Sequence, residues 1–334
     1  MMPLRGLRFW APFQIDALGL VTLFGAREMN RSIGNLTQSW ITEWLPTLGS
    51  YAVANDEILE PDPGFVLYNI TDQIMATDVS TWFTRWLISY PLTYTATTIT
   101  LTSNTKPMSS ELRACSILIG GLTLAVPLLF AILTEDWWGF ANVIALCLTV
   151  IVRQQMVGLL RSSINKNFED AMDDPGDEVK AFLTIPNGKA VTIRGSRQVV
   201  VNCLLTNPQP PNPTYYFILK AIGWGAFGVH AVALGMTALF NQILCVVMLL
   251  VCTYLTAVHV GDDHGVIGNR LRLDVDMGDP KWNRSSVYAR LDMSEEEENC
   301  MVQWSILPQR SNVWWWNRYR QTCIVARQKD LVRA

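Results

Sequence analysis

The sequence has few charged residues and lacks the short motifs that mark the common enzyme classes. Only 16% of its 334 residues are charged, against about 25% in a typical soluble domain. It contains no Gly-x-Ser-x-Gly, His-Glu-x-x-His or P-loop pattern, which argues against α/β-hydrolases, zinc proteases and P-loop nucleotidases. The net charge of −3 is too small to favour nucleic acid as a partner. We predict no cofactor and lean against an enzyme.

The cysteines form neither a disulfide framework nor a zinc site. There are seven of them, an odd number, and no Cys-x-x-Cys pair occurs. Several lie inside strongly apolar stretches. This pattern indicates reduced cysteines that contribute to packing.

Long apolar runs are what the sequence does contain. Half of the residues are hydrophobic, and a helix needs about 20 mainly apolar residues to cross a bilayer. The segments that reach or approach this length are 114–133, 137–152, 215–239 and 242–260. The connections 134–136 and 240–241 are very short. We therefore predict a mainly α integral membrane protein with about four transmembrane helices in two tight hairpins.

Basic residues collect between the hairpins, whereas the hairpin tips carry none. The loop between the hairpins holds Arg153, Arg161, Lys166, Lys180, Lys189, Arg194 and Arg197. The positive-inside rule then places this loop and both termini in the cytoplasm, at the plasma membrane or an endomembrane. In this orientation the glycosylation sequons should stay unmodified; they begin at Asn30, Asn35, Asn69 and Asn283.

The apolar spans divide the chain into five segments. These are an N-terminal cytoplasmic region with amphipathic helices (1–113), a first hairpin (114–152), a cytoplasmic helix and β-meander with a Pro-rich connector (153–214), a second hairpin (215–260) and a cytoplasmic tail (261–334). The small antiparallel meander is predicted from strands at 181–185, 190–194 and 199–206. The first two flank Asn187-Gly188, which is a strong hairpin signal.

The N-terminal region leaves several alternatives open. The apolar run 15–26 is too short to span a bilayer and predicts an amphipathic or re-entrant helix. Residues 33–48 look helical. Residues 93–102 alternate with β-branched side chains and favour a strand, although a Thr-rich fifth membrane segment over 82–101 is a second interpretation.

The C-terminal tail has two helix signals. Ser294 with Glu297 forms a capping box that opens a helix. A second segment then combines aromatic with basic side chains, and we interpret it as a helix at the membrane interface, with a protein-packed aromatic patch as the alternative. Its interface residues are Trp314, Trp315, Trp316, Arg318 and Arg320.

Several stretches are similar to predicted membrane proteins of filamentous fungi. They are VVVNCLLT at 199–206, PPNP at 210–213, YPLTYT at 90–95 and PQRSN at 308–312. The resemblance covers roughly residues 80–325. It implies an uncharacterised multi-pass membrane protein family and transfers no catalytic residue.

Polar residues within the spans are candidates for function. His230 lies in the middle of the third span, where an ionisable side chain marks a functional site by default. A neutral imidazole bonded to another span, with Asn142 as partner, is the structural interpretation. Gly225, Gly228 and Gly235 recur along the same span and predict close approach of another helix.

Four residues of metal-binding types cluster after the fourth span. His259, Asp262, Asp263 and His264 combine imidazole and carboxylate groups that suit a divalent transition metal. Their spacing matches no established ligand motif, so a solvated helix end is the alternative.

The sequence leaves three functional hypotheses. The first is a non-enzymatic scaffold or accessory membrane subunit, with the lipid bilayer and a protein partner or second copy as its partners. The second is a transporter or channel that uses His230 and the glycine stripe. The third is a membrane-embedded, metal-dependent enzyme.

Overall fold

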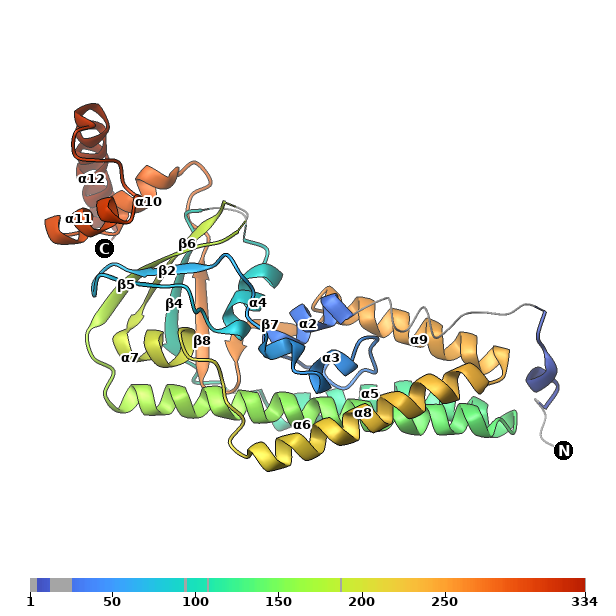
Figure 1. Cartoon of the computed structure of the whole chain (residues 1–334). Coiled ribbons are helices and arrows are strands. Elements are labelled where there is room, and N and C mark those ends of the chain that lie inside the picture. The colour runs from blue at the N-terminus through green and yellow to red at the C-terminus, as the bar shows by residue number, and fades with distance from the viewer. Residues whose placement is uncertain (1–4, 13–25, 93–94, 107, 187, 334) are drawn as a thin grey trace.

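The computed structural model describes residues 5–12, 26–92, 95–106, 108–186 and 188–333 (Figure 1). The predicted helix at 15–26 therefore lies almost wholly outside the described residues. The helices are η1 (Arg5–Phe9), α2 (Ala26–Gly34), α3 (Tyr51–Ala54), η2 (Glu57–Leu59), α4 (Thr81–Ser89), α5 (Ser110–Leu133), α6 (Trp137–Asp173), α7 (Arg197–Val199), η3 (Val200–Leu204), α8 (Pro213–Met236), α9 (Leu239–Ala257), α10 (Arg284–Arg290), α11 (Glu295–Gln303) and α12 (Val313–Arg333). The strands are β1 (Thr37–Ser39), β2 (Val66–Asn69), β3 (Ile74–Ala76), β4 (Thr98–Ser103), β5 (Glu178–Thr184), β6 (Ala190–Ser196), β7 (Asp262–Ile267) and β8 (Leu271–Asp276).

Four helices are long and apolar enough to cross a membrane, as predicted: α5, α6, α8 and α9. The protein is thus membrane-associated. Helix α6 packs along α8, and α5 contacts both α6 and α9. The helix predicted within 153–214 is present and continues the second span, because α6 runs without a break to Asp173.

The turns at the ends of these helices meet in a buried polar cluster. Asp136 caps α6 by accepting from the backbone of Gly139 at 3.0 Å. Its other carboxylate oxygen accepts from the Ala238 backbone and from the Asn241 side chain, both at 2.9 Å. Asn241 also donates to the Thr134 hydroxyl. These bonds hold the α5–α6 turn against the α8–α9 turn, so the four helices end at one level.

The strands form one sheet in the order β1-β7-β8-β4-β6-β5-β2-β3. The predicted β5–β6 hairpin is confirmed, with residues 178–184 paired antiparallel to 190–196. The predicted third strand at 199–206 is wrong, because the chain forms α7 and η3 there. The free edge of β6 is taken by β4, which pairs with it in parallel and leaves no place for a following strand. Val199, Val200, Cys203 and Leu204 are instead buried in the core at helical spacing.

Two further N-terminal expectations need correction. The segment 82–101 is no fifth membrane helix, because α4 ends at Ser89 and β4 begins at Thr98. Its apolar character reflects burial of Trp82, Phe83 and Trp86 in the core of the sheet region. The segment 33–48 is not one helix, because α2 ends at Gly34 and β1 follows. The strand expected within 93–102 is confirmed by β4.

The sheet separates two hydrophobic cores. Along β5, Ala181 and Leu183 face a core shared with α4 and α6, whereas Phe182 faces a core formed with α10, α11 and α12. This alternation is the two-residue period of a strand buried on both sides. Figure 1 shows α6 below the sheet and the C-terminal helices beyond it, away from the four apolar helices.

A non-helical loop enters the group of apolar helices. We call residues 40–50 the inserted loop. Its Leu48 packs in a cluster with buried residues of all four apolar helices: Leu124, Leu146, Val150, Leu234, Cys245, Val246 and Leu249. The Leu48 N–H donates to the hydroxyl of Thr253 in α9 at 2.8 Å. The Thr253 hydroxyl thus satisfies one backbone donor of an irregular segment that lies among apolar helices, where an unpaired polar group is costly.

Candidate functional site

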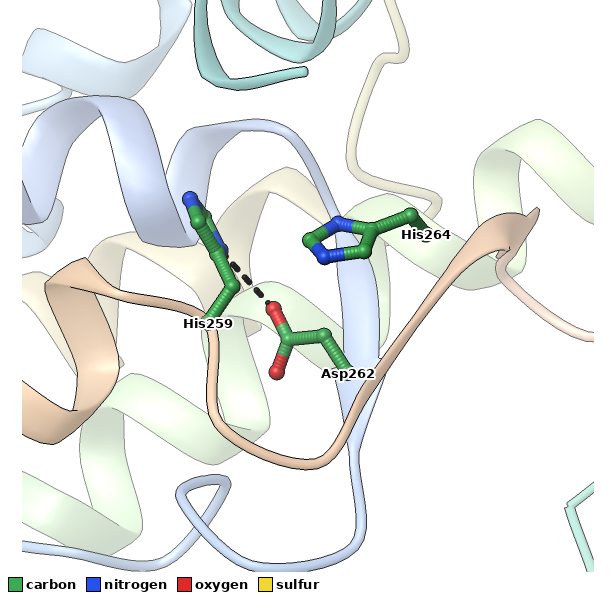
Figure 2. A group of neighbouring side chains, drawn as sticks. All are labelled: His259, Asp262 and His264. Carbon is green, nitrogen blue, oxygen red and sulfur yellow. Dashed lines mark hydrogen bonds and ion pairs between the residues drawn. The ribbon is translucent and has the colours of Figure 1, made fainter. Parts of the chain in front are cut away.

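The candidate site lies where α9 leaves the apolar helices and the chain turns into β7. Figure 2 shows the rings of His259 and His264 on either side of the Asp262 carboxylate. His259 Nδ1 lies 2.9 Å from Asp262 Oδ2, and the two imidazole rings are 5.2 Å apart between centroids. One nitrogen of each ring and one Asp262 oxygen all lie within 4.8 Å of one another.

Local backbone geometry explains how three residues of the stretch 259–264 converge in this way. His259 and Gly261 both have positive φ, at 56° and 76°, which reverses the chain after α9. Asp262 and His264 then occupy alternate positions of β7, so their side chains share one face of the sheet. Asp263 belongs to the opposite face and accepts instead from the Gly265 backbone. Of the four predicted metal-site residues, the structure brings together three and excludes Asp263.

The surrounding elements hold the cluster in a half-buried setting. The Asp262 and His259 side chains are only 7% and 11% exposed. Trp86 of α4 donates its indole N–H to the backbone oxygen of His264 at 2.7 Å, and Tyr90 packs edge-on against the His264 ring. Burial lowers the pKa of His264, more than the nearby Asp262 carboxylate raises it. The ring is therefore neutral at pH 7 and has a lone pair for a ligand.

The donor groups of this arrangement are of the kind that bind a metal ion. Two imidazoles and a carboxylate are a donor set found for zinc and for non-haem iron.

No protein-family model matches the chain, and no curated protein or solved structure is significantly similar to it. The comparisons assign no family. The site is therefore interpreted from its own chemistry, and the resemblance to fungal membrane proteins stays a prediction.

The third histidine forms the contact proposed from the sequence. His230 Nδ1 of α8 lies 2.6 Å from Asn142 Oδ1 of α6. The Asn142 amide nitrogen donates to Cys245 of α9 at 3.2 Å. The Asn142 oxygen therefore accepts, and His230 carries a proton on Nδ1. This buried chain of polar groups ties three helices together.

The predicted glycine contacts are wrong within the chain. A Cβ added at Gly225, Gly228 or Gly235 would meet nothing within 4 Å, and none of the three is buried. The buried face of α8 instead carries Gly223, where a Cβ would lie 2.9 Å from that of Ala54. The spacing identified a stripe of small residues but could not show which side of α8 it occupies.

The C-terminal aromatic residues divide between two environments. Trp316 is 7% exposed and packs with α10 and α11, whereas Trp314 is 69% exposed. Arg320 is also engaged, because it binds the carboxylate of Glu298 through two bonds of 2.8 and 2.7 Å. Trp315 is partly buried against Tyr319, and Arg318 lies over the Trp314 ring. Helix α12 lies beyond the sheet from the apolar helices (Figure 1). Of the predicted interface residues, Trp314 and Arg318 are exposed, whereas Trp315 is partly buried and Trp316 is buried.

Replacing Glu298 with Gln is expected to loosen α12 from α11. Glu298 is 1% exposed and joins Arg310 of the connecting segment to Arg320 of α12. A neutral amide keeps the shape but loses these charge-assisted bonds, at a cost of about 1–3 kcal/mol, reduced because both arginines stay hydrated. Limited proteolysis within 304–312 should become faster. Exposed Glu296→Gln on the same helix is the control and should leave the rate unchanged.

Sequence reasoning missed the polar residues that hold the inserted loop. Arg153 is 3% exposed and donates to Thr47 Oγ1 and to the backbone oxygens of Glu43 and Leu45, at 2.7–2.8 Å. Arg161 pairs with the Glu43 carboxylate. From the sequence, both arginines could be interpreted only as positive charges of a cytoplasmic loop, because the sequence does not show which carbonyl groups lie opposite them.

Proposed function

We propose that the protein is a non-enzymatic membrane scaffold or accessory subunit that holds its sheet region at a fixed position on the cytoplasmic face. The observation that carries this proposal is the unbroken helix α6. Its 37 residues give a length of about 55 Å, against about 30 Å for the hydrocarbon core. The C-terminal half of α6, which includes Met156, Leu160 and Ile164, shares one hydrophobic core with the sheet.

The interior of the apolar helices supports a scaffold over a transporter. The inserted loop fills the space between the helices, and the cavity that His230 lines has a volume of about 20 Å³. Such a volume holds about one water molecule. The buried His230–Asn142–Cys245 chain acts in this proposal as a helix-to-helix bond and not as part of a transport path.

The cytoplasmic placement of the sheet is supported by the common level of the two helix turns. Both turns meet at Asp136 and carry no basic residue, whereas the sheet end carries the basic loop. A membrane-impermeant maleimide should label Lys281→Cys, but not Glu135→Cys, in sealed vesicles with the cytoplasmic face outward. Detergent should expose Glu135→Cys, and labelling of the unsubstituted chain gives the background of the native cysteines. Labelling of Glu135→Cys before detergent is added would contradict the proposed orientation and place the two helix turns on the cytoplasmic side.

A scaffold requires a partner, either another protein or a second copy of the chain. Trp and Arg are the residue types most enriched at binding hot spots, and Trp314 with Arg318 presents them on the outer side of α12. We expect the full chain, crosslinked in its own membranes and purified in detergent, to carry a stoichiometric partner. The double variant Trp314→Ala and Arg318→Ala should lose it, whereas exposed Val325→Ala should retain it. A monomeric chain that moves solute into proteoliposomes would instead favour a transporter.

A further inference from the structure

We propose that His259, Asp262 and His264 bind one divalent transition-metal ion, zinc in the first instance, at the junction of α9 and β7. This site is independent of the scaffold function. Its donors come from two structural elements: His259 follows the last apolar helix, and Asp262 and His264 belong to the sheet. A bound ion would therefore cross-link the apolar helices to the sheet.

The distances between the donor atoms are close to those of a metal site. Ligand atoms around tetrahedral zinc, at bonds of about 2.0–2.1 Å, lie about 3.4 Å from each other. Here the three donor atoms lie within 4.8 Å of one another, and one pair, His259 Nδ1 and Asp262 Oδ2, is already 2.9 Å apart. In this proposal the side chains rotate on zinc binding to close the remaining gap. A metal would replace the proton on His259 Nδ1, because ligands bind in their deprotonated form.

The groups around the donors fit the supporting role that metal sites require. Thr37 Oγ1 lies 3.4 Å from Asp262 Oδ2, and the Trp86 bond fixes the backbone of His264. Such outer contacts orient ligands and are part of most metal sites. Three protein ligands leave the fourth position of a tetrahedral zinc ion to water, which is the composition of an open zinc site.

A solvated helix end, the alternative interpretation, explains these features less well. A solvated cluster would leave its charged groups in water, whereas Asp262 is buried at the base of two imidazoles. The neighbouring Asp263 provides the contrast within this chain. It has the same charge and is adjacent in sequence, but it faces the other side of β7 and accepts from the adjacent turn.

The test measures metal content of the full chain in detergent, after a chelator wash and re-addition of zinc. We expect one zinc ion per chain by elemental analysis. His259→Asn and Asp262→Asn should each weaken zinc binding by more than the roughly 10- to 100-fold cost of losing a second-shell contact. Asparagine tolerates the positive φ at 259 better than most residues, so the first variant keeps the turn. Asp263→Asn is the matched control and should bind one zinc ion with unchanged affinity.

X-ray absorption at the zinc edge of the unsubstituted chain gives a second measurement that does not depend on a variant folding. It should show two imidazole ligands with zinc–nitrogen distances near about 2.0–2.1 Å. Zinc at less than stoichiometric amounts, a spectrum without imidazole scattering, or equal loss in Asp262→Asn and Asp263→Asn would each overturn the proposal.

Discussion

Arg153→Met is expected to unfold the inserted loop and to lower the stability of the whole protein. The guanidinium donates to three oxygens of the loop: Thr47 Oγ1, Glu43 O and Leu45 O. Methionine fills a similar volume but donates nothing. Glu43 O keeps the Gln154 amide as a donor and Thr47 Oγ1 keeps Ser50 as a partner, whereas Leu45 O loses the guanidinium. A buried acceptor that loses its donor costs about 1–3 kcal/mol, so we expect a loss of about 1–3 kcal/mol in the free energy of unfolding.

The measurement combines an unfolding titration in mixed micelles with hydrogen exchange of the loop amides. The amide of Leu48 is the most informative, because its bond to Thr253 should open when the loop detaches. Arg153→Lys should restore little stability, since one ammonium cannot reproduce the planar fork of donors. Lys166→Met, at a less buried position of the same helix, is the control and should change stability by less than about 0.5 kcal/mol. Equal stability of Arg153→Met and Lys166→Met would mean that the arginine does not hold the loop.

The features that could be predicted from the sequence depend on neighbouring residues. The apolar runs identified α5, α6, α8 and α9, the Asn187-Gly188 turn identified the β5–β6 hairpin, and the Ser294–Glu297 capping box is present in α11. In each case the physical cause lies within a few residues or one helix length. The His230–Asn142 contact is an exception, since the two residues are 88 positions apart; it could be predicted because few polar groups are available within the apolar helices.

The features that could not be predicted depend on contacts between distant segments. The eight-stranded sheet joins strands from the N-terminal, middle and C-terminal parts of the chain. The third strand was wrongly predicted at 199–206 because β4, about a hundred residues earlier, takes the edge it needed. The metal-site prediction included Asp263 for a related reason. Only the strand geometry of β7 separates Asp262 from Asp263, and the few residues after an apolar helix gave no sign of a strand.

Gly120 and its neighbour Gly121 show how a contact with a distant segment can make two adjacent residues differ in their tolerance of a side chain. The sequence alone makes these two glycines of α5 look equivalent. In the structure, a Cβ at Gly120 would lie 2.4 Å from the backbone oxygen of Trp44 and 2.7 Å from its Cβ, whereas one at Gly121 would meet nothing within 4 Å. The backbone of the inserted loop cannot move aside as the end of a flexible side chain could. The helix and the loop approach each other this closely only because residue 120 has no side chain.

Opposite effects are therefore expected from alanine at these adjacent positions. Gly120→Ala should force the inserted loop away from α5 and cost about 1–3 kcal/mol, as overpacking of a filled core does. Gly121→Ala should be neutral or stabilise by up to about 1 kcal/mol, because alanine favours the helix over glycine. The unfolding titration used for Arg153 measures both, and hydrogen exchange at Leu48 should rise only in Gly120→Ala. If both variants had the same stability, the loop would not lie against α5, and the space between the four apolar helices would be open to another occupant.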